Sequence, residues 1–173
     1  MNLGYRDDKD RCYGASGMAI GLVVFDGEDV LSGISVDAEA DSMVEFNDNF
    51  YFSGNPGLSA KVAWNQILRN FNLMSVMLIS NVMCRSMVQD DRSIEDSTRA
   101  HLHDTLSNEG IETCSLEKDE MDRLFDKNFN YLLKVFSHNG VRHIAHDFAA
   151  TLKEQRRLSR NEILEHLHAL GML

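Results

Sequence analysis

The sequence predicts one α+β domain over residues 1–173, in which an N-terminal antiparallel sheet of three or four strands packs on a long central helix. A C-terminal helical region follows. Apolar residues alternate with a period of two before Pro56 and with a period of 3.6 after it, which indicates strands first and helices later. Pro56 is the single proline of the 173 residues, which favours long helices. Hydrophobic residues make up 43% of the chain, enough for a core without disulfides or metals.

Residues 14–54 are predicted to form the sheet, after a charged tail, residues 1–13, that is open to disorder. The apolar run 18–25, a turn at 26–29 and the run 30–36 together predict a hairpin, with Gly27 able to adopt positive φ. Over residues 43–53, four apolar side chains alternate with polar ones, so this segment is either one strand or a second hairpin. The turn-forming residues 47–49 favour the hairpin.

Residues 58–170 are predicted to be helical. The first helix spans residues 58–88, with Ser59 as its N-cap and no proline or glycine inside it. Its stretch 70–84 carries no charge, so it must be surrounded by protein or lipid. A membrane span needs about 20 apolar residues. The shorter run here, which contains asparagine and serine, predicts a core helix and the most buried element of the fold.

Further helices are predicted after residue 93. The first spans residues 94–108 and ends before Gly110, and the next begins at Ser115 as N-cap and ends at Asn139-Gly140 in a left-handed cap. A third spans residues 141–157. The last spans residues 160–170, and its start is marked by Ser159 and Glu162, the spacing of a capping box.

The charge of the chain is strongly acidic and unevenly distributed. The formal net charge is −10, and residues 1–60 hold eleven acids against three bases, which makes this third a poor nucleic-acid surface. One basic cluster occurs at the turn between the last two helices: Lys153, Arg156, Arg157 and Arg160. This turn could bind nucleic acid, but we favour the acidic first third as its partner, within one chain or across a dimer.

Cysteine usage predicts a reducing compartment. Cys12, Cys84 and Cys114 lie in three different contexts and form no CxxC pair. No apolar stretch that could act as a signal peptide follows the charged N-terminus. We therefore expect a cytoplasmic protein with no membrane contact.

The seven histidines include residues spaced as metal ligands could be. His143 and Asp147 lie one helical turn apart, and the adjacent pair His146-Asp147 resembles the centre of the HD-domain metal phosphohydrolases. That resemblance implies an earlier histidine, for which His101 or His103 is available, and a later aspartate. No aspartate follows Asp147, so the ligand set is incomplete. The sequence thus predicts no catalytic, cofactor or metal site, and these five residues are the candidates if that expectation fails.

The expected function is a non-catalytic homodimeric interaction or structural module whose sheet and methionine-rich helix supply the contact surfaces. The four methionines of the helix serve either the core or a dimer face. Two alternatives remain open: an HD-like hydrolase using His143, His146 and Asp147, and a nucleic-acid-binding regulator using the basic turn 153–160. No small-molecule ligand is predicted from the sequence.

Overall fold

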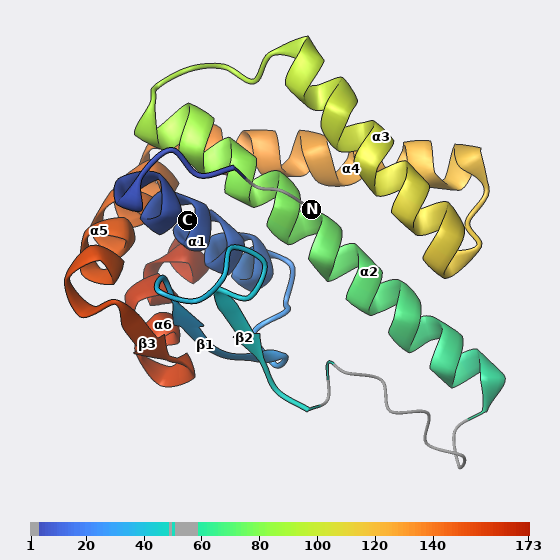
Figure 1. Ribbon diagram of the computed structural model, residues 1–173, viewed down its shortest axis with the longest axis horizontal. Helices are drawn as coiled ribbons and strands as arrows, with labels where there is room; N and C mark the ends of the chain where they lie inside the picture. Colours follow the sequence, from blue (N-terminus) through green and yellow to red (C-terminus); the bar gives the residue numbers. More distant parts are fainter. Residues whose placement is uncertain (1–3, 49, 51–58) are drawn as a thin grey trace.

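The computed structural model describes residues 4–48, 50 and 59–173 (Figure 1). These residues form six α-helices and a three-stranded antiparallel sheet, which confirms the α+β class. The helices are α1 (Asp8–Val24), α2 (Ala60–Met83), α3 (Asp96–Cys114), α4 (Lys118–Ser137), α5 (Asn139–Gln155) and α6 (Arg160–Leu167). The strands are β1 (Leu31–Ser35), β2 (Val44–Phe46) and β3 (Arg157–Ser159). A π-helical turn, Cys84–Gln89, continues α2, and a 3-10 turn, His168–Met172, continues α6.

Residues 18–24 are helical and Phe25 is the C-cap of that helix, so the strand predicted over 18–25 is wrong. These residues belong to α1, which begins where the Asp7 side chain accepts a hydrogen bond from the backbone N–H of Asp10. The expectation of a disordered tail also fails for residues 8–13, which form the first turns of α1. Tertiary packing overrides the local β preference of residues 18–25. The helix α1 lies in the middle of the molecule, and 12 of its 17 residues are buried.

Glycines set the distance between α1 and α2. Gly14, Gly17 and Gly21 recur along one face of α1 and lie against Ser80 and Asn81 of α2. A Cβ atom at Gly17 would overlap the carbonyl oxygen of Ser80, and one at Gly21 would overlap the Ser80 side chain. The two helices therefore meet at backbone contact, which a larger residue at position 17 would prevent.

The sheet takes its third strand from the C-terminal part of the chain. Its order is β2-β1-β3, with Ile34 of β1 opposite Val44 on one side and Leu158 on the other. The strand β3 thus occupies the place in the sheet that we predicted for residues 18–25. After β2 the chain turns, and the rings of Phe46 and Phe50 stack with centroids 4.0 Å apart. Residues 51–53 of the predicted second hairpin lie outside the described residues.

The long helix predicted over residues 58–88 is confirmed as α2 and its π-helical continuation. The Ser59 hydroxyl accepts a hydrogen bond from the Val62 N–H, as expected for an N-cap. Burial along α2 is uneven, because all ten buried residues lie at or after Phe71. The helix α1 is more enclosed, so the prediction that this helix is the most buried element is wrong.

The span Ala60–Gln89 is the one described helix that is long and apolar enough to cross a membrane. However, 72% of its most apolar window is buried inside the protein. Core helices pass the same test of length and composition, and the uncharged stretch 70–84 is surrounded by protein for most of its length, as the sequence predicted.

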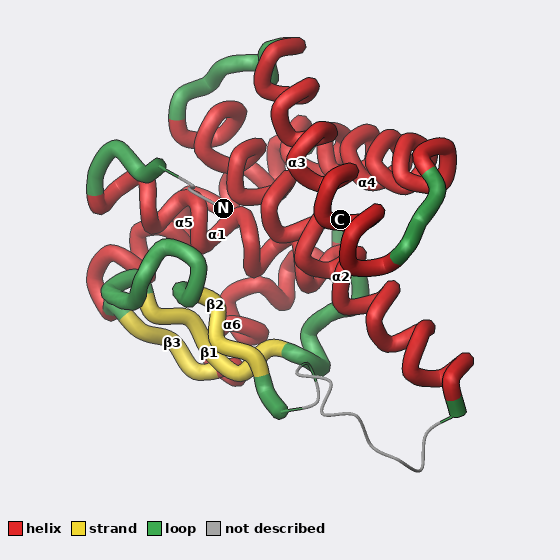
Figure 2. Tube along the Cα trace, turned by 45° about the vertical axis from the view of Figure 1, so that its right-hand side comes forward, coloured by secondary structure: helices red, strands yellow, loops and turns green. Residues whose placement is uncertain are grey.

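The helices lie on two sides of α2. The α3–α4 hairpin packs on one side and α1 packs on the other, with α5 behind α1 and against the π-helical turn (Figures 1 and 2). The sheet contacts α1, α5 and α6, so α1 lies between most of the sheet and α2. We predicted a direct contact of the sheet with the long helix; the extra helix in residues 8–24 explains the difference.

Two predicted helix boundaries shift. The helix α3 continues through Gly110 to Cys114. A Cβ at Gly110 would press on Phe71 of α2 and Met121 of α4, so this glycine permits close packing and does not end the helix. Ser115 ends α3 with φ of 49°, and Glu117 rather than Ser115 caps α4.

Of the two predicted boundaries later in the chain, one is wrong and one is confirmed. No left-handed cap forms at Asn139-Gly140, since His138 is extended and α5 begins at Asn139. The Ser159–Glu162 capping box is confirmed, with the Ser159 N–H 2.8 Å from the Glu162 carboxylate.

Candidate functional site

The histidines proposed as metal ligands lie on two separate helices. His101 and His103 belong to α3, whereas His143, His146 and Asp147 belong to α5. His143 Nε2 lies 3.4 Å from the Asp147 carboxylate, the contact that their spacing predicted, and both side chains are exposed. Within residues 4–48, 50 and 59–173, no three His, Cys, Asp or Glu side chains converge as a metal site would require.

Two of these histidines join neighbouring helices. His146 Nδ1 forms a hydrogen bond of 2.6 Å with the Tyr13 hydroxyl, which links α5 to α1. His103 Nε2 forms one of 2.8 Å with the Asp122 carboxylate, and its ring lies edge-on to Phe125 of α4. Both rings are therefore engaged in helix–helix contacts.

The basic turn 153–160 meets the acidic first third of the same chain. Arg156 pairs with Asp8 at 2.8 Å and with Asp37 at 2.6 Å. These hydrogen bonds lower the pKa values of both carboxyl groups. Two further arginines extend the contact: Arg157 pairs with Glu45 at 3.0 Å, and Arg160 donates a hydrogen bond to the Glu28 carbonyl at 3.0 Å. Of the two partners that we favoured for this turn, the intramolecular one is present, and it ties β3 to the acidic loops around β1.

A buried charge cluster connects the N-terminus to the end of α2. The side chain of Asp10 has no exposed surface and accepts hydrogen bonds from Arg85 Nε at 2.9 Å and from the Arg6 guanidinium at 2.8 Å. Burial alone would raise the pKa of Asp10, but the bonds from Arg85 and Arg6 outweigh it and hold the pKa far below its ordinary value. The Arg85 guanidinium also lies over the Tyr5 ring, 4.8 Å from its centroid.

This cluster is a structural clamp that sequence reasoning missed. Tyr5 also accepts a hydrogen bond from the Asn81 side chain at 2.7 Å, so the clamp includes the glycine-lined contact between α1 and α2. Arg85 lies in the π-helical turn that follows α2. Its position directly after the uncharged run 70–84 was an available signal, whereas nothing in the sequence separates Asp10 from its exposed neighbours.

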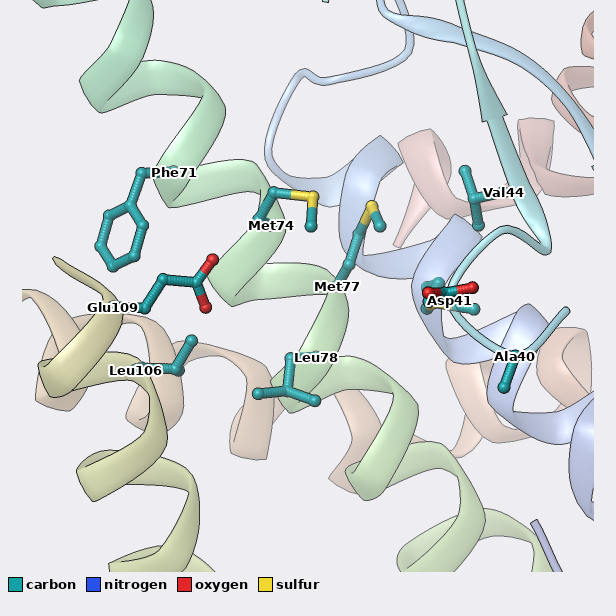
Figure 3. A pocket seen from close by; sticks show the side chains of 10 residues that line it. Ala40, Asp41, Val44, Phe71, Met74, Met77, Leu78, Leu106 and Glu109 are labelled. Carbon is teal, nitrogen blue, oxygen red and sulfur yellow. The ribbon is translucent and has the colours of Figure 1, made fainter. Parts of the chain in front are cut away.

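A second face of α2, beside the one that packs on α1, borders an apolar pocket (Figure 3). Its volume is about 180 Å³. Four of its lining residues come from α2, and the others come from α1, the β1–β2 loop, β2 and α3. The lining residues are Met18, Ala40, Asp41, Val44, Phe71, Met74, Met77, Leu78, Leu106 and Glu109.

The polar groups of the pocket are two carboxylates on different walls. Figure 3 shows Glu109 of α3 on one side, Asp41 of the β1–β2 loop on the other, and the side chains of Met74 and Met77 between them. No lysine, arginine or histidine lines the pocket. An apolar hollow with a few charged groups is the usual form of a small-molecule site. The sequence signal for it was the methionine content of α2, which we interpreted as core or dimer face.

Comparison with known protein families, with curated proteins and with solved structures gives no match. Function is therefore inferred from two features of this chain. One is the half of α2 that lacks buried residues, and the other is the pocket beside its second half.

Proposed function

We propose that the protein is a non-catalytic interaction module of the cytoplasm that forms a homodimer through the first turns of α2, residues 60–70. One observation carries the proposal: none of these residues is buried, although the segment includes four large apolar side chains. Trp64 is 39% exposed. In both views this end of α2 extends beyond the other helices (Figures 1 and 2). Exposed apolar surface with a tryptophan is typical of protein interfaces.

The charges of the segment favour a second copy of this acidic chain as the partner. Residues 60–70 contain Lys61 and Arg69 and no acid. Arg69 pairs with Asp29 of its own chain, and Lys61 is exposed. The turn between α3 and α4, residues 112–120, holds four acids and one base: Glu112, Glu117, Lys118, Asp119 and Glu120.

The position of that turn fits a two-fold arrangement. The end of α3 reaches α2 at Phe71, where Gly110 lies against the Phe71 ring, so the turn 112–120 and the segment 60–70 are neighbours in one chain. A two-fold axis between them would set each segment against the acidic turn of the other copy, which is how an isologous interface is built.

Burial of the cysteines supports the cytoplasmic assignment. Cys12, Cys84 and Cys114 are free and buried. Burial raises the pKa of all three thiols, so they remain protonated and pack as small apolar groups. Free thiols of this kind are typical of reducing compartments.

The dimer is tested by light scattering on a size-exclusion column. We expect wild-type protein to elute at twice the chain mass of 19.6 kDa and the variant Trp64→Glu at the chain mass. The matched control is Met172→Glu, since Met172 is an apolar residue that is 71% exposed and lies in the 3-10 turn after α6, which packs on α5 and α6. This variant should remain dimeric. A wild-type monomer at micromolar concentration, in low and high salt alike, would refute the proposal, as would a dimeric Trp64→Glu variant.

A further inference from the structure

We infer that the pocket between α2, α3 and the β1–β2 loop binds a small apolar amine, a molecule with one ring or short alkyl chain and a cationic head group. Its volume of about 180 Å³ sets the size of the apolar part. An engineered cavity of about 150 Å³ binds benzene. The pocket here therefore has room for one six-membered ring with a short chain.

The walls suit a ligand whose shape is not tightly specified. Three of the ten lining residues are methionines, and Phe71, Leu78 and Leu106 add rigid apolar surface. Methionine side chains are flexible and polarisable, so they adapt to different apolar ligands. Met74 is 41% exposed, which leaves the pocket accessible from solvent without separation of the helices.

The charges of the walls select a cation. Asp41 and Glu109 are the only ionisable lining residues, and neither has an ion-pair partner among the residues that the structure describes. Asp41 accepts a hydrogen bond of 3.0 Å from the Ser42 hydroxyl, which leaves lone pairs for a ligand. The Phe71 ring face also attracts cations. An anionic ligand would meet repulsion from both carboxylates.

The amine site and the dimer rest on different observations. The pocket begins at Phe71, directly after residues 60–70, and no lining residue belongs to that segment. A monomeric protein would therefore still be expected to bind the amine.

A series of three probes with one ring and different charge tests the inference: 4-phenylbutylamine, 4-phenylbutan-1-ol and 4-phenylbutyrate. Protein labelled at the methionine methyl groups with ¹³C is titrated with each probe and followed by NMR. The amine should shift the methyl signals of Met18, Met74 and Met77 in a saturable way, while the signal of the exposed C-terminal Met172 stays unchanged. Its dissociation constant should be lower than that of the alcohol, and the butyrate should bind most weakly.

The double variant Asp41→Asn, Glu109→Gln tests the origin of the charge preference. Both side chains are exposed and outside ion pairs in the described part of the chain, so the fold should be unaffected. The amine should lose about threefold in affinity for each carboxylate removed, the size of an exposed charge pair, and should approach the unchanged affinity of the alcohol. Glu39→Gln, two residues before Asp41 in the β1–β2 loop, changes an exposed acid that does not line the pocket; it is the matched control and should leave the preference intact. Equal binding of amine and butyrate to the wild type, the absence of methionine shifts with every probe, or an undiminished preference in the double variant would each overturn the inference.

Discussion

The two sides of α2 are built in opposite ways. Toward α1, the helix presents Ser80 and Asn81 to a row of glycines, and no space remains for a single added Cβ. Toward α3 and β2, it presents Phe71, Met74 and Met77 around a hollow of about 180 Å³. Small residues occur where the neighbouring backbone is in contact, and long flexible ones occur where the neighbour is distant. From this difference we infer that the α1 side of α2 (the closed side) stabilises the fold, whereas the side toward α3 and β2 (the open side) has room for a ligand.

The closed side also holds the buried charges. Asp10 of α1 and Arg85 at the end of α2 fix the two helices at one end of the glycine row. A buried ion pair gives little net stability by itself, but loss of one partner leaves an uncompensated charge. We therefore expect the closed side to be sensitive to small changes and the open side to tolerate them.

The largest effect is expected for Asp10→Asn. The substitution keeps the side-chain shape but removes the charge that faces Arg85 and Arg6, and it should lower the free energy of unfolding by about 3–5 kcal/mol. Urea denaturation followed by circular dichroism measures the change. Asp7→Asn is the control, because asparagine is as good an N-cap as aspartate, and it should have almost no effect. A loss under about 1 kcal/mol for Asp10→Asn would show that the clamp is not a closed, buried unit.

Substitutions at the pocket side of α2 should lower the free energy of unfolding less than the loss of the Asp10 charge does. Phe71 is 6% exposed and borders the hollow, so Phe71→Ala should cost about 3 kcal/mol, at the low end of the range for buried phenylalanines. Met77→Leu conserves volume and should cost less than about 1.5 kcal/mol. The same urea melts apply. If Phe71→Ala proved more damaging than Asp10→Asn, the ranking of the two sides would be reversed.

Low pH should reduce the stability that Asp10 contributes to the contact between α1 and α2. The pKa of Asp10 is depressed in the folded protein, so its contribution to stability is complete above the unfolded pKa of about 4 and decreases as the pH falls below that value. Wild-type protein should therefore lose about 2 kcal/mol more than Asp10→Asn between pH 5 and pH 2. The carboxyl groups of Asp8, Asp29 and Asp37, whose pKa values are also lowered, are common to both proteins and largely cancel. Parallel pH profiles for the two proteins would disagree with this assignment.

Features that depend on neighbouring residues were predictable from the sequence. The helix after Pro56, its Ser59 cap and the Ser159–Glu162 capping box follow from local hydrogen bonds and a 3.6-residue period, and the structure confirms all three. The strands near residues 31–35 and 44–46 follow from local alternation in the same way.

Features that depend on distant residues were not predictable. The glycine spacing of residues 14–21 has meaning only beside Ser80, and without that neighbour the apolar run 18–25 has the local pattern of a strand. The strand β3 has three residues and is stabilised by β1, more than 120 residues earlier in the chain. Nothing in the sequence distinguishes Asp41 and Glu109 from other surface acids, and only the fold places both at one pocket.

The helices α1 and α2 are in backbone contact, whereas the face of α2 toward α3 and β2 borders free space. One pair of enlarging substitutions tests this difference: Gly17→Ala on the closed side and Ala40→Val at the pocket wall, compared by their free energies of unfolding in urea. Alanine is a better helix former than glycine by about 1 kcal/mol, so Gly17→Ala would stabilise a helix with no close neighbour. We predict instead a net loss of about 1–3 kcal/mol for Gly17→Ala, from the clash with the Ser80 carbonyl oxygen, and a change of less than about 1 kcal/mol for Ala40→Val. A neutral or stabilising Gly17→Ala together with a strongly destabilising Ala40→Val would contradict this difference between the two faces of α2.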